Sequence, residues 1–470
     1  MSRGSSLAKN TIIIAIGSFF PRIAGFITLP ILTGYLTKTE YGTLDLITIL
    51  TSLLLPSVTL QIQAAAFRFI IDSREDNTRQ KKIITNIFVM IIPVSVAALV
   101  IFYFILPNTA FNIKFCICLY LFFNMVATAL RQVARGFGKN REYTISAIIS
   151  AFSKMILVVL FVWGAKKGLF GAVIGLVLST IISTVYLFKK LNIYSYISRE
   201  NIDKQILVEM LSYSWPLVPN EMSQWVMRVS DRVVVTWFIG IAANAVYAVA
   251  NKIPSIIMLA QSAFTLAWQE NASISSKDKD ASEYYSHMFE IMYKLYAGFF
   301  GIVIALMPVL FKVLIRGDYG EAYVQMPILC IAIFFAGIST FFGGIYVAYK
   351  ASKSVGVTTL VAASINLAVD IGTIKWLGLY AASGSTLVSY IFLCIYRMRD
   401  VQKLVKVSYS IRKFLGVIVL LVLEGALCYL RIPVCNIINI VLGSVSFVLL
   451  NKSFLQAVLS KVQHILRNRG

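Results

Sequence analysis

The chain has 470 residues, of which 58% are hydrophobic and only 14% are charged. Soluble proteins carry about 25% charged residues, so this composition excludes a soluble enzyme and predicts a membrane protein. The net charge of +22 does not indicate nucleic-acid binding, because the basic residues occur in short clusters between apolar stretches rather than on one continuous face.

Apolar stretches of about 20 residues follow one another along the chain, and each is long enough to cross about 30 Å of hydrocarbon. The pattern predicts an all-α polytopic membrane protein with about fourteen transmembrane helices joined by short loops. The first stretch is too long for the core of a signal peptide and contains Pro21 and Arg22, so we expect it to be a retained span. The predicted spans are 11–33, 42–67, 84–106, 114–134, 144–164, 169–188, 212–238, 245–268, 286–311, 323–348, 357–376, 379–396, 414–430 and 434–451.

Basic residues concentrate in alternate loops. Most of the 43 Lys and Arg residues lie in the terminal segments and in every second loop, for example in Arg74–Lys82, Arg135–Arg141 and Arg397–Lys413. The positive-inside rule places these loops, and with them both termini, in the cytoplasm. The opposite loops, such as 107–113 and 165–168, are very short. Because they are too short to hold an active site, the pattern favours transport and indicates that the protein is not an enzyme.

The chain contains a weak internal repeat. Three identical pairs stand at a constant offset of 214 residues: Lys139 and Lys353, Thr144 and Thr358, Ser150 and Ser364. Six predicted spans separate the two copies, so both halves share one membrane orientation, an arrangement that transporters use for alternating access. We therefore predict two six-helix lobes related by a parallel repeat, followed by two further helices.

Segments 201–211 and 453–469 carry apolar side chains at helical spacing, which predicts amphipathic helices lying at the membrane surface. Together with the repeat, they complete a predicted domain organisation. It consists of an N-terminal six-helix lobe (1–190), a cytoplasmic amphipathic linker (191–211), a C-terminal six-helix lobe (212–400), helices 13 and 14 (401–451) and an amphipathic cytoplasmic tail (452–470).

Several basic residues lie inside the predicted spans, where a charge is costly and usually functional. Lys294 has a simpler explanation, since Glu290 precedes it by one helical turn and can pair with it. The others favour a cationic, water-filled cavity between the two lobes that binds an anionic substrate, because Arg matches phosphate with paired hydrogen bonds. These candidate substrate-binding residues are Arg22, Lys154, Arg228, Arg232 and Lys252.

Acidic residues are fewer within the spans. Glu221, Asp231 and Asp370 are candidates for coupling transport to an ion gradient or for an internal ion network. Asp231 stands beside Arg228 and Arg232 in the seventh span, so a purely structural ion network of these three residues is an open alternative.

The six cysteines and two histidines form no recognisable metal-binding or catalytic pattern. No two cysteines have C-x-x-C spacing, and the chain lacks a glycine-rich motif that would cradle the phosphates of a nucleotide. We therefore expect no catalytic residues, no bound metal and no cofactor.

Four segments resemble a known family: Gly34–Asp45 (GYLTKTEYGTLD), Arg135–Arg141 (RGFGKNR), the stretch from Ser230-Asp-Arg232 to Gly240, and Val246–Pro254 (VYAVANKIP). They are similar to the Wzx-type flippases, which move O-antigen or capsule repeat units. That family belongs to the multidrug/oligosaccharidyl-lipid/polysaccharide exporter superfamily. The resemblance covers nearly the whole chain, and its motifs are specific for the family rather than for one substrate.

The resemblance implies a two-lobed bundle in the bacterial inner membrane that moves an undecaprenyl-diphosphate-linked oligosaccharide for lipopolysaccharide or capsule synthesis. It implies alternation between inward- and outward-open states, with basic residues on the diphosphate. Arg22, Arg228 and Arg232 correspond best to the basic residues of related flippases, while Asp370 and Glu221 are candidates for coupling. The implied partners are the lipid-linked oligosaccharide, membrane lipids and other polysaccharide assembly proteins, with no nucleic acid.

Three alternatives remain open at this point. A lipid II flippase of the same superfamily fits the four segments less well. A drug–cation antiporter is disfavoured by the predicted cationic cavity, because cations need acidic lining groups. An integral-membrane glycan polymerase or glycosyltransferase is disfavoured by the short outer loops.

Overall fold

A computed structural model describes residues 3–105, 111–452, 455–456 and 460. Eighteen α-helices and a few short 3-10 and π turns account for the regular structure of these residues, which contain no β-strand. The prediction of an all-α polytopic membrane fold is therefore confirmed. The helices form two compact units, Met1–Val229 (unit 1) and Ser230–Gly470 (unit 2), and each is considered by itself below.

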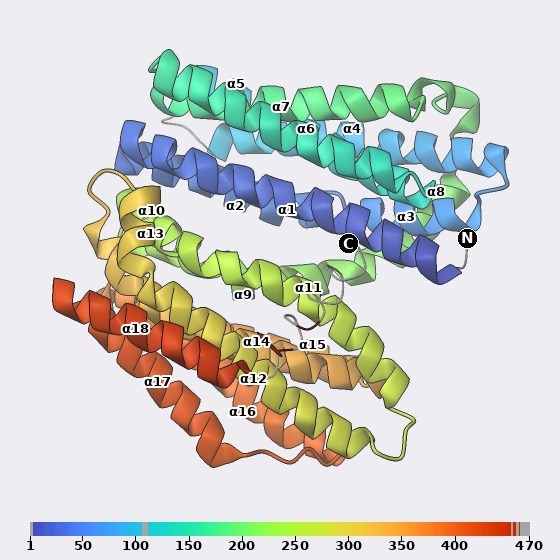
Figure 1. Ribbon diagram of the computed structural model, residues 1–470. Helices are drawn as coiled ribbons and strands as arrows, with labels where there is room; N and C mark the ends of the chain where they lie inside the picture. The colour runs from blue at the N-terminus through green and yellow to red at the C-terminus, as the bar shows by residue number, and fades with distance from the viewer. Residues whose placement is uncertain (1–2, 106–110, 453–454, 457–459, 461–470) are drawn as a thin grey trace, which may run out of the picture. The chain divides into compact units, whose positions relative to one another are not determined.

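Unit 1 is a bundle in which the axes of the long helices α1 and α4 to α7 are roughly parallel or antiparallel (Figure 1). Helix α1 packs against α6, and α7 packs against both α5 and α6. The helices of this unit are α1 (Arg3–Tyr35), α2 (Lys38–Val58), α3 (Ile62–Asp72), α4 (Asn77–Ile105), α5 (Phe111–Gly136), α6 (Asn140–Val158), α7 (Gly168–Lys190), α8 (Lys204–Ser214) and the first half of α9 (Val218–Phe238).

Unit 2 repeats much of this packing. The helix pairs α14–α16, α15–α16 and α12–α14 pack closely, as α5–α7, α6–α7 and α4–α5 do in unit 1. This correspondence follows the order of the predicted repeat. Besides the second half of α9, the helices of unit 2 are α10 (Ile241–Ala250), α11 (Lys252–Ser275), α12 (Ala281–Ala305), α13 (Met307–Leu314), α14 (Gly320–Ala348), α15 (Ser352–Leu377), α16 (Leu379–Asp400), α17 (Ile411–Leu430) and α18 (Pro433–Leu450).

Each of the fourteen predicted spans falls on a helix or on a pair of consecutive helices. In the described part of the chain, eleven helices are long and apolar enough to cross a membrane, or up to twelve if the bent pair Ile241–Ala250 and Lys252–Met258 is one span. The expected span 42–67 is two helices, because Leu60 and Gln61 between α2 and α3 have left-handed backbone angles that end the first helix.

Two of the sequence motifs have clear structural roles in unit 1. Thr37 and Glu40 form a reciprocal capping box at the start of α2, and Glu40 Oε1 also accepts a hydrogen bond from the backbone N–H of Leu169 at 3.0 Å. Gly136, at the end of α5, lies so close to Ile70 of α3 that any side chain would collide with it. Arg74 Nε donates to the Gly136 carbonyl at 2.8 Å. These contacts tie α2 to α7 and α3 to α5.

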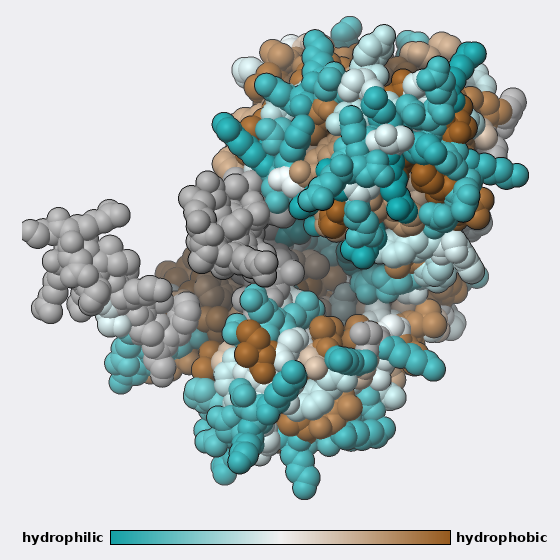
Figure 2. Space-filling model, turned by 90° about the vertical axis from the view of Figure 1, so that its right-hand side faces the viewer, coloured by the Kyte–Doolittle hydropathy of each residue, from teal (hydrophilic) through white to brown (hydrophobic). Residues whose placement is uncertain are grey.

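The predicted amphipathic linker helix at 201–211 is present as α8, which packs on α3 and α4 of unit 1. Met210 is fully buried in this contact, and Lys82 Nζ of α4 lies 2.9 Å from Asp203 Oδ2 at the start of α8. Figure 2 shows that hydrophilic side chains gather on the surface turned toward the viewer, with smaller apolar patches among them. Most of the predicted amphipathic tail, 452–470, lies outside the described residues.

Candidate functional site

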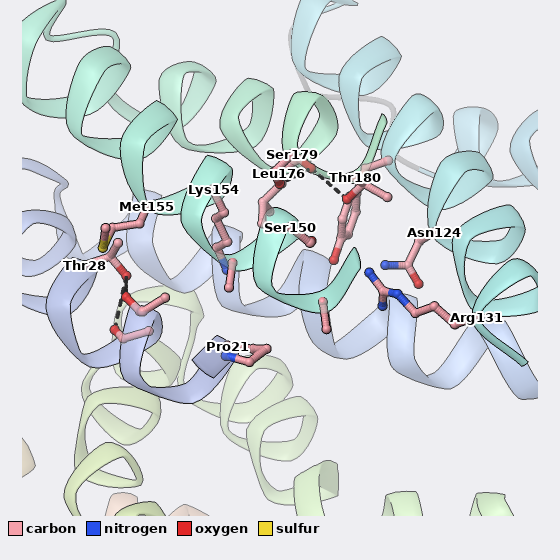
Figure 3. A pocket seen from close by; sticks show the side chains of 15 residues that line it. Pro21, Thr28, Asn124, Arg131, Ser150, Lys154, Met155, Leu176, Ser179 and Thr180 are labelled. Atoms are coloured by element: carbon pink, nitrogen blue, oxygen red, sulfur yellow. Dashed lines mark hydrogen bonds between the residues drawn. The ribbon is translucent and has the colours of Figure 1, made fainter. Parts of the chain in front are cut away.

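Unit 1 contains a cavity of about 210 Å³ between α1, α5, α6 and α7. Two basic side chains line it, Arg131 from α5 and Lys154 from α6, whereas no acidic side chain is among its lining residues. In Figure 3 these two side chains enter from different sides, with Ser150 between them and Asn124 beside the Arg131 guanidinium. The cavity is therefore both cationic and rich in hydrogen-bonding groups.

Helix α1 leaves space for the cavity because its lining residues are small. Pro21 and Gly25 stand one turn apart on this helix and line the cavity, and no neighbouring atom lies within 4 Å of the position that a Cβ on Gly25 would occupy. The hydroxyls of Thr28 and Thr180 donate hydrogen bonds to backbone carbonyls of their own helices. Thr28 donates to Ala24 at 3.0 Å, and Thr180 donates to Leu176 at 2.8 Å. Their oxygens therefore remain available as acceptors.

Arg131 is the residue of this cavity that the sequence did not single out. Its Nε atom is buried and has no hydrogen-bond partner among the described residues. Its charge interacts with the hydroxyls of Tyr120 and Tyr143. Buried polar groups are normally paired, so an unpaired guanidinium nitrogen beside a cavity points to a ligand that the protein is built to receive.

The structure places the five predicted substrate-binding residues at different points. Lys154 lines the cavity, but the other four are not among its lining residues. Arg22 is exposed on α1 next to Pro21, and Arg228 is exposed on α9, where its Nε donates to the Gln224 carbonyl at 3.2 Å. Arg232 and Lys252 are partly buried in unit 2, at the second half of α9 and the start of α11.

Unit 2 holds a buried acidic cluster that joins four helices. Asp231 of α9 accepts hydrogen bonds at Oδ2 from the hydroxyls of Tyr247 (α10) at 3.0 Å and Thr386 (α16) at 2.6 Å. With the Asn366 amide nitrogen turned toward Asp231, it donates to Oδ1 at 2.8 Å, and the amide oxygen accepts from the Thr386 backbone N–H at 3.2 Å. Asp231 is thus fully hydrogen-bonded by neutral groups.

Asp370 lies one turn after Asn366 on α15 and interacts electrostatically with Asp231. It is completely buried, and neither of its carboxylate oxygens has a hydrogen-bond partner among the described residues. Asp231 also interacts electrostatically with Arg232, its neighbour on α9. Two interacting buried carboxyl groups favour binding of a further positive charge, because buried negative charges are costly unless they are compensated. The cluster offers only oxygen ligands and an amide, which suits a proton or a hard monovalent cation.

Asp231 and Asp370 thus come together as two of the three predicted coupling residues, while Glu221 does not join them. Glu221 stands ten residues before Asp231 on α9, about 15 Å along the helix axis. Sequence reasoning missed Asn366, Thr386 and Tyr247, which are neutral and therefore carry no charge signal inside a span. In the described part of the chain, no three His, Cys, Asp or Glu side chains group in a way that suits a metal ion.

With both sites defined, comparison with known proteins gives the family. Residues 7–269 match the sequence profile of the family described as polysaccharide biosynthesis protein, which is more than half of the chain. The chain belongs to this family. A search of curated protein sequences finds no match.

Solved structures with a similar fold are membrane transporters. An inward-facing multidrug resistance MATE family transporter of the MOP superfamily is 10% identical with a TM-score of 0.69, covering 83% of this chain and 98% of that one. The lipid II flippase MurJ in an inward closed conformation is 15% identical with a TM-score of 0.67, covering 95% and 100%. At these identities the likeness shows that the chain shares the fold of these proteins.

A third structure bears on the polarity of the sites. A MOP superfamily transporter from Pyrococcus furiosus Vc1, described by the reversed polarity of its binding pocket, is 11% identical with a TM-score of 0.57, covering 85% of this chain and 96% of that one. The fold therefore occurs with binding pockets of different polarity.

Proposed function

We propose that this protein is a flippase that moves undecaprenyl-diphosphate-linked oligosaccharide repeat units from the cytoplasmic to the outer leaflet of the bacterial inner membrane by alternating access. Membership of the polysaccharide biosynthesis family supports a glycan substrate. The observation that carries the proposal is the cationic cavity of unit 1, lined by Arg131 and Lys154 with no acidic side chain, because an anionic lipid-linked substrate needs basic contacts within the membrane.

Arg22, Lys154, Arg228, Arg232 and Lys252 bind the diphosphate and the glycan in this proposal, while the lipid tail stays among membrane lipids. Both termini are cytoplasmic, and the glycan is an O-antigen, capsule or related lipopolysaccharide unit. The protein is a transporter rather than an enzyme and works beside other polysaccharide assembly proteins. It uses neither nucleic acid nor a cofactor.

Transport is coupled to an ion gradient at the acidic cluster of unit 2. A proton or a sodium ion occupies the site formed by Asp231 and Asp370, with the Thr386 hydroxyl as a further oxygen ligand. Because the cluster joins α9, α10, α15 and α16, loading and release of the cation change the interactions of four helices at once. Glu221 is a second candidate for coupling.

The substrate contacts are tested by changing Arg22 and Arg228 to Ala in cells that depend on this protein for surface glycan. We expect surface glycan to fall in both variants at normal expression, because each loses a charge that holds the diphosphate. Arg199→Ala, an exposed arginine outside the helices that hold the sites, is the matched control. Normal glycan in both test variants would contradict the assignment. Glycosyltransferase and polymerase genes beside this gene would indicate the substrate class.

A lipid II flippase is the second candidate, favoured by the similarity to the MurJ fold over 95% of the chain. Complementation separates the two functions. Rescue of cells depleted of their lipid II flippase would favour the second candidate, whereas restored surface glycan in a strain lacking its repeat-unit flippase supports the first.

A further inference from the structure

We propose that Glu424 of unit 2 is a proton-binding site, at which the folded protein holds a neutral carboxylic acid between α12, α17 and α18. Helices α17 and α18 follow the two repeated sets of helices, and both pack on α12 (Figure 1). The site stands apart from the acidic cluster, since Asp231 and Asp370 lie on α9 and α15. It goes beyond the proposed function and does not depend on it, because the proton is bound whatever the protein transports.

Glu424 lies deep within a helix that is long and apolar enough to cross a membrane. It stands thirteen residues after Ile411, the first residue of α17, which is about 20 Å along the helix axis. None of its surface is exposed. An ionisable side chain at such a position is costly and indicates a function.

Glycines of the neighbouring helices leave room for the carboxyl group. A Cβ on Gly301 of α12 would lie 2.7 Å from Oε2 of Glu424 and 3.1 Å from Oε1, so the carboxyl group packs directly on the α12 backbone. A Cβ on Gly443 of α18 would lie 2.8 Å from the Cβ of Ala305 and 3.1 Å from the carbonyl oxygen of Gly301. Helices α12 and α18 are therefore in close contact beside the carboxyl group.

The hydrogen bonds of this interface are incomplete. Ser446 of α18 donates to Oε1 of Glu424 at 3.3 Å, whereas Oε2 is buried and has no hydrogen-bond partner among the described residues. The amide nitrogen of Asn439 donates to the backbone carbonyl of Glu424 at 3.0 Å, but its Oδ1 is a second buried acceptor without a donor in the described part of the chain. A proton on Glu424 turns its carboxyl group into a donor, which this interface lacks.

The basic side chains nearest to the site along α12 and α17 are engaged elsewhere. Lys294, seven residues before the α12 glycine, pairs with Glu290 at 2.6 Å. Arg431, seven residues after Glu424, lies 4.8 Å from the centre of the Tyr323 ring. Seven residues correspond to about 10 Å along a helix. A buried carboxylate without a nearby cation is so costly that the group takes up a proton instead.

The titratable groups around Glu424 are neutral acids rather than bases. The thiol of Cys428, one turn later on α17, interacts electrostatically with Glu424. From α14, Tyr323 and Cys330 interact with Cys428. Helices α12 and α18 contribute glycines and Ser446, which do not titrate. Loss of the proton therefore leaves a negative charge without compensation and weakens the packing of α17 and α18 on α12.

Infrared spectroscopy of the purified full-length protein in lipid tests the protonation directly, because a neutral carboxylic acid absorbs in a band separate from that of a carboxylate. At about pH 6, where exposed glutamates are ionised, we expect Glu424→Gln to lose intensity in the acid band. Glu283→Gln, at an exposed position in the first turn of α12, should lose none. Asp370→Asn should leave the contribution of Glu424 in place, which separates this site from the acidic cluster.

The melting temperature as a function of pH measures the consequence for stability. The wild type should lose stability as the pH rises from about 6 to about 9, because the folded protein must then bury a charge at Glu424. Glu424→Gln cannot ionise, so its melting temperature should fall by roughly 3 °C less over the same range. Glu283→Gln should follow the wild type.

Glu424→Met protects the test against a folding defect that is specific to Glu424→Gln. Methionine is also uncharged and similar in length, so this variant should show the same reduced dependence on pH. An acid band of equal intensity in the wild type and Glu424→Gln, or equal pH dependence in the wild type and both variants, would overturn the proposal. Neither measurement involves transport, so failure of the flippase proposal leaves this result unaffected.

Discussion

The two units use matching helices to carry opposite charges. In unit 1, α5 and α6 carry Arg131 and Lys154 into a cavity, whereas in unit 2, α15 carries Asp370 into a closed cluster with Asp231. Helix α15 is the counterpart of α6 in the repeat, so one scaffold presents a cation in one copy and an acid in the other. The difference teaches that the repeated packing fixes the helices, while a few residues decide which charge each unit presents.

The largest effect is expected from Asp370→Asn in unit 2. The amide keeps the size of the side chain but removes the charge that a coupling cation needs, so we expect transport to fall by about tenfold or more in vesicles with an imposed proton or sodium gradient. The melting temperature should equal or exceed that of the wild type, because a buried carboxyl without a partner is replaced by a neutral group.

Full gradient-driven transport by Asp370→Asn would remove the acidic cluster from the coupling mechanism. Comparing a proton gradient with a sodium gradient in the wild type identifies the ion. Only a gradient of the ion that binds the cluster should drive transport. Glu221→Gln tests the second candidate in the same vesicles.

A second contrast concerns one arginine in each unit. Arg397 of α16 is 5% exposed and fully used inside the protein, with donations to the Ser339 carbonyl at 2.9 Å and to the hydroxyls of Thr358 and Thr359 at 3.0 and 2.9 Å. Arg131 has a buried Nε without a partner among the described residues. One arginine therefore holds α14, α15 and α16 together, and the other is available to a ligand.

Arg397→Met should lower the free energy of unfolding by about 3 kcal/mol, because several buried acceptors lose a charged donor. Arg399→Met, an exposed neighbour on the same helix, should have little effect on stability. Thermal unfolding in detergent measures both. Arg131→Gln should not destabilise unit 1 to the same degree, and a larger loss of stability than in Arg397→Met would mean that Arg131 is structural.

The sequence predicted the helices well, whereas the structure brings only some of the predicted site residues together. Long apolar stretches indicate membrane spans directly. The break between α2 and α3, however, depends on Leu60 and Gln61, which adopt left-handed backbone angles without being glycines, so the sequence does not predict it. Arg131 was overlooked because it stands near the end of the predicted span 114–134, where a basic residue usually reaches water. In the fold it lies one turn deeper than Arg135 and lines a cavity instead.

Unit 2 shows why the partners of a predicted charge are harder to find. Asp231 was expected beside Arg228 and Arg232 on its own helix, since neighbours along a helix are visible in the sequence. It does interact electrostatically with Arg232. Its hydrogen bonds come from α10, α15 and α16, and the residue nearest in number, Tyr247, is sixteen positions away. Tertiary packing creates that site, and local spacing carries no information about it.

The smallest effect is expected at the linker helix, which in unit 1 is held to α4 by an ion pair. The hydrogen bond from Lys82, with those from the backbone N–H groups of Ile206 and Gln205, lowers the pKa of Asp203 below its ordinary value. A carboxyl with a lowered pKa stabilises the folded state above its unfolded pKa of about 3.9, and this contribution is lost as the pH falls through the lower folded value. Docking of α8 should therefore weaken in acid but not at neutral pH.

Asp203→Asn removes this contribution at neutral pH, so the amide protection factors of α8 should fall below those of the wild type at pH 7. The two proteins should converge in acid, once Asp203 of the wild type is protonated as well. Glu200→Gln, three residues earlier and exposed, is the control and should leave α8 protected. A difference between wild type and Asp203→Asn that persists unchanged at low pH would show that the amide acts through the helix cap rather than through the charge that pairs with Lys82.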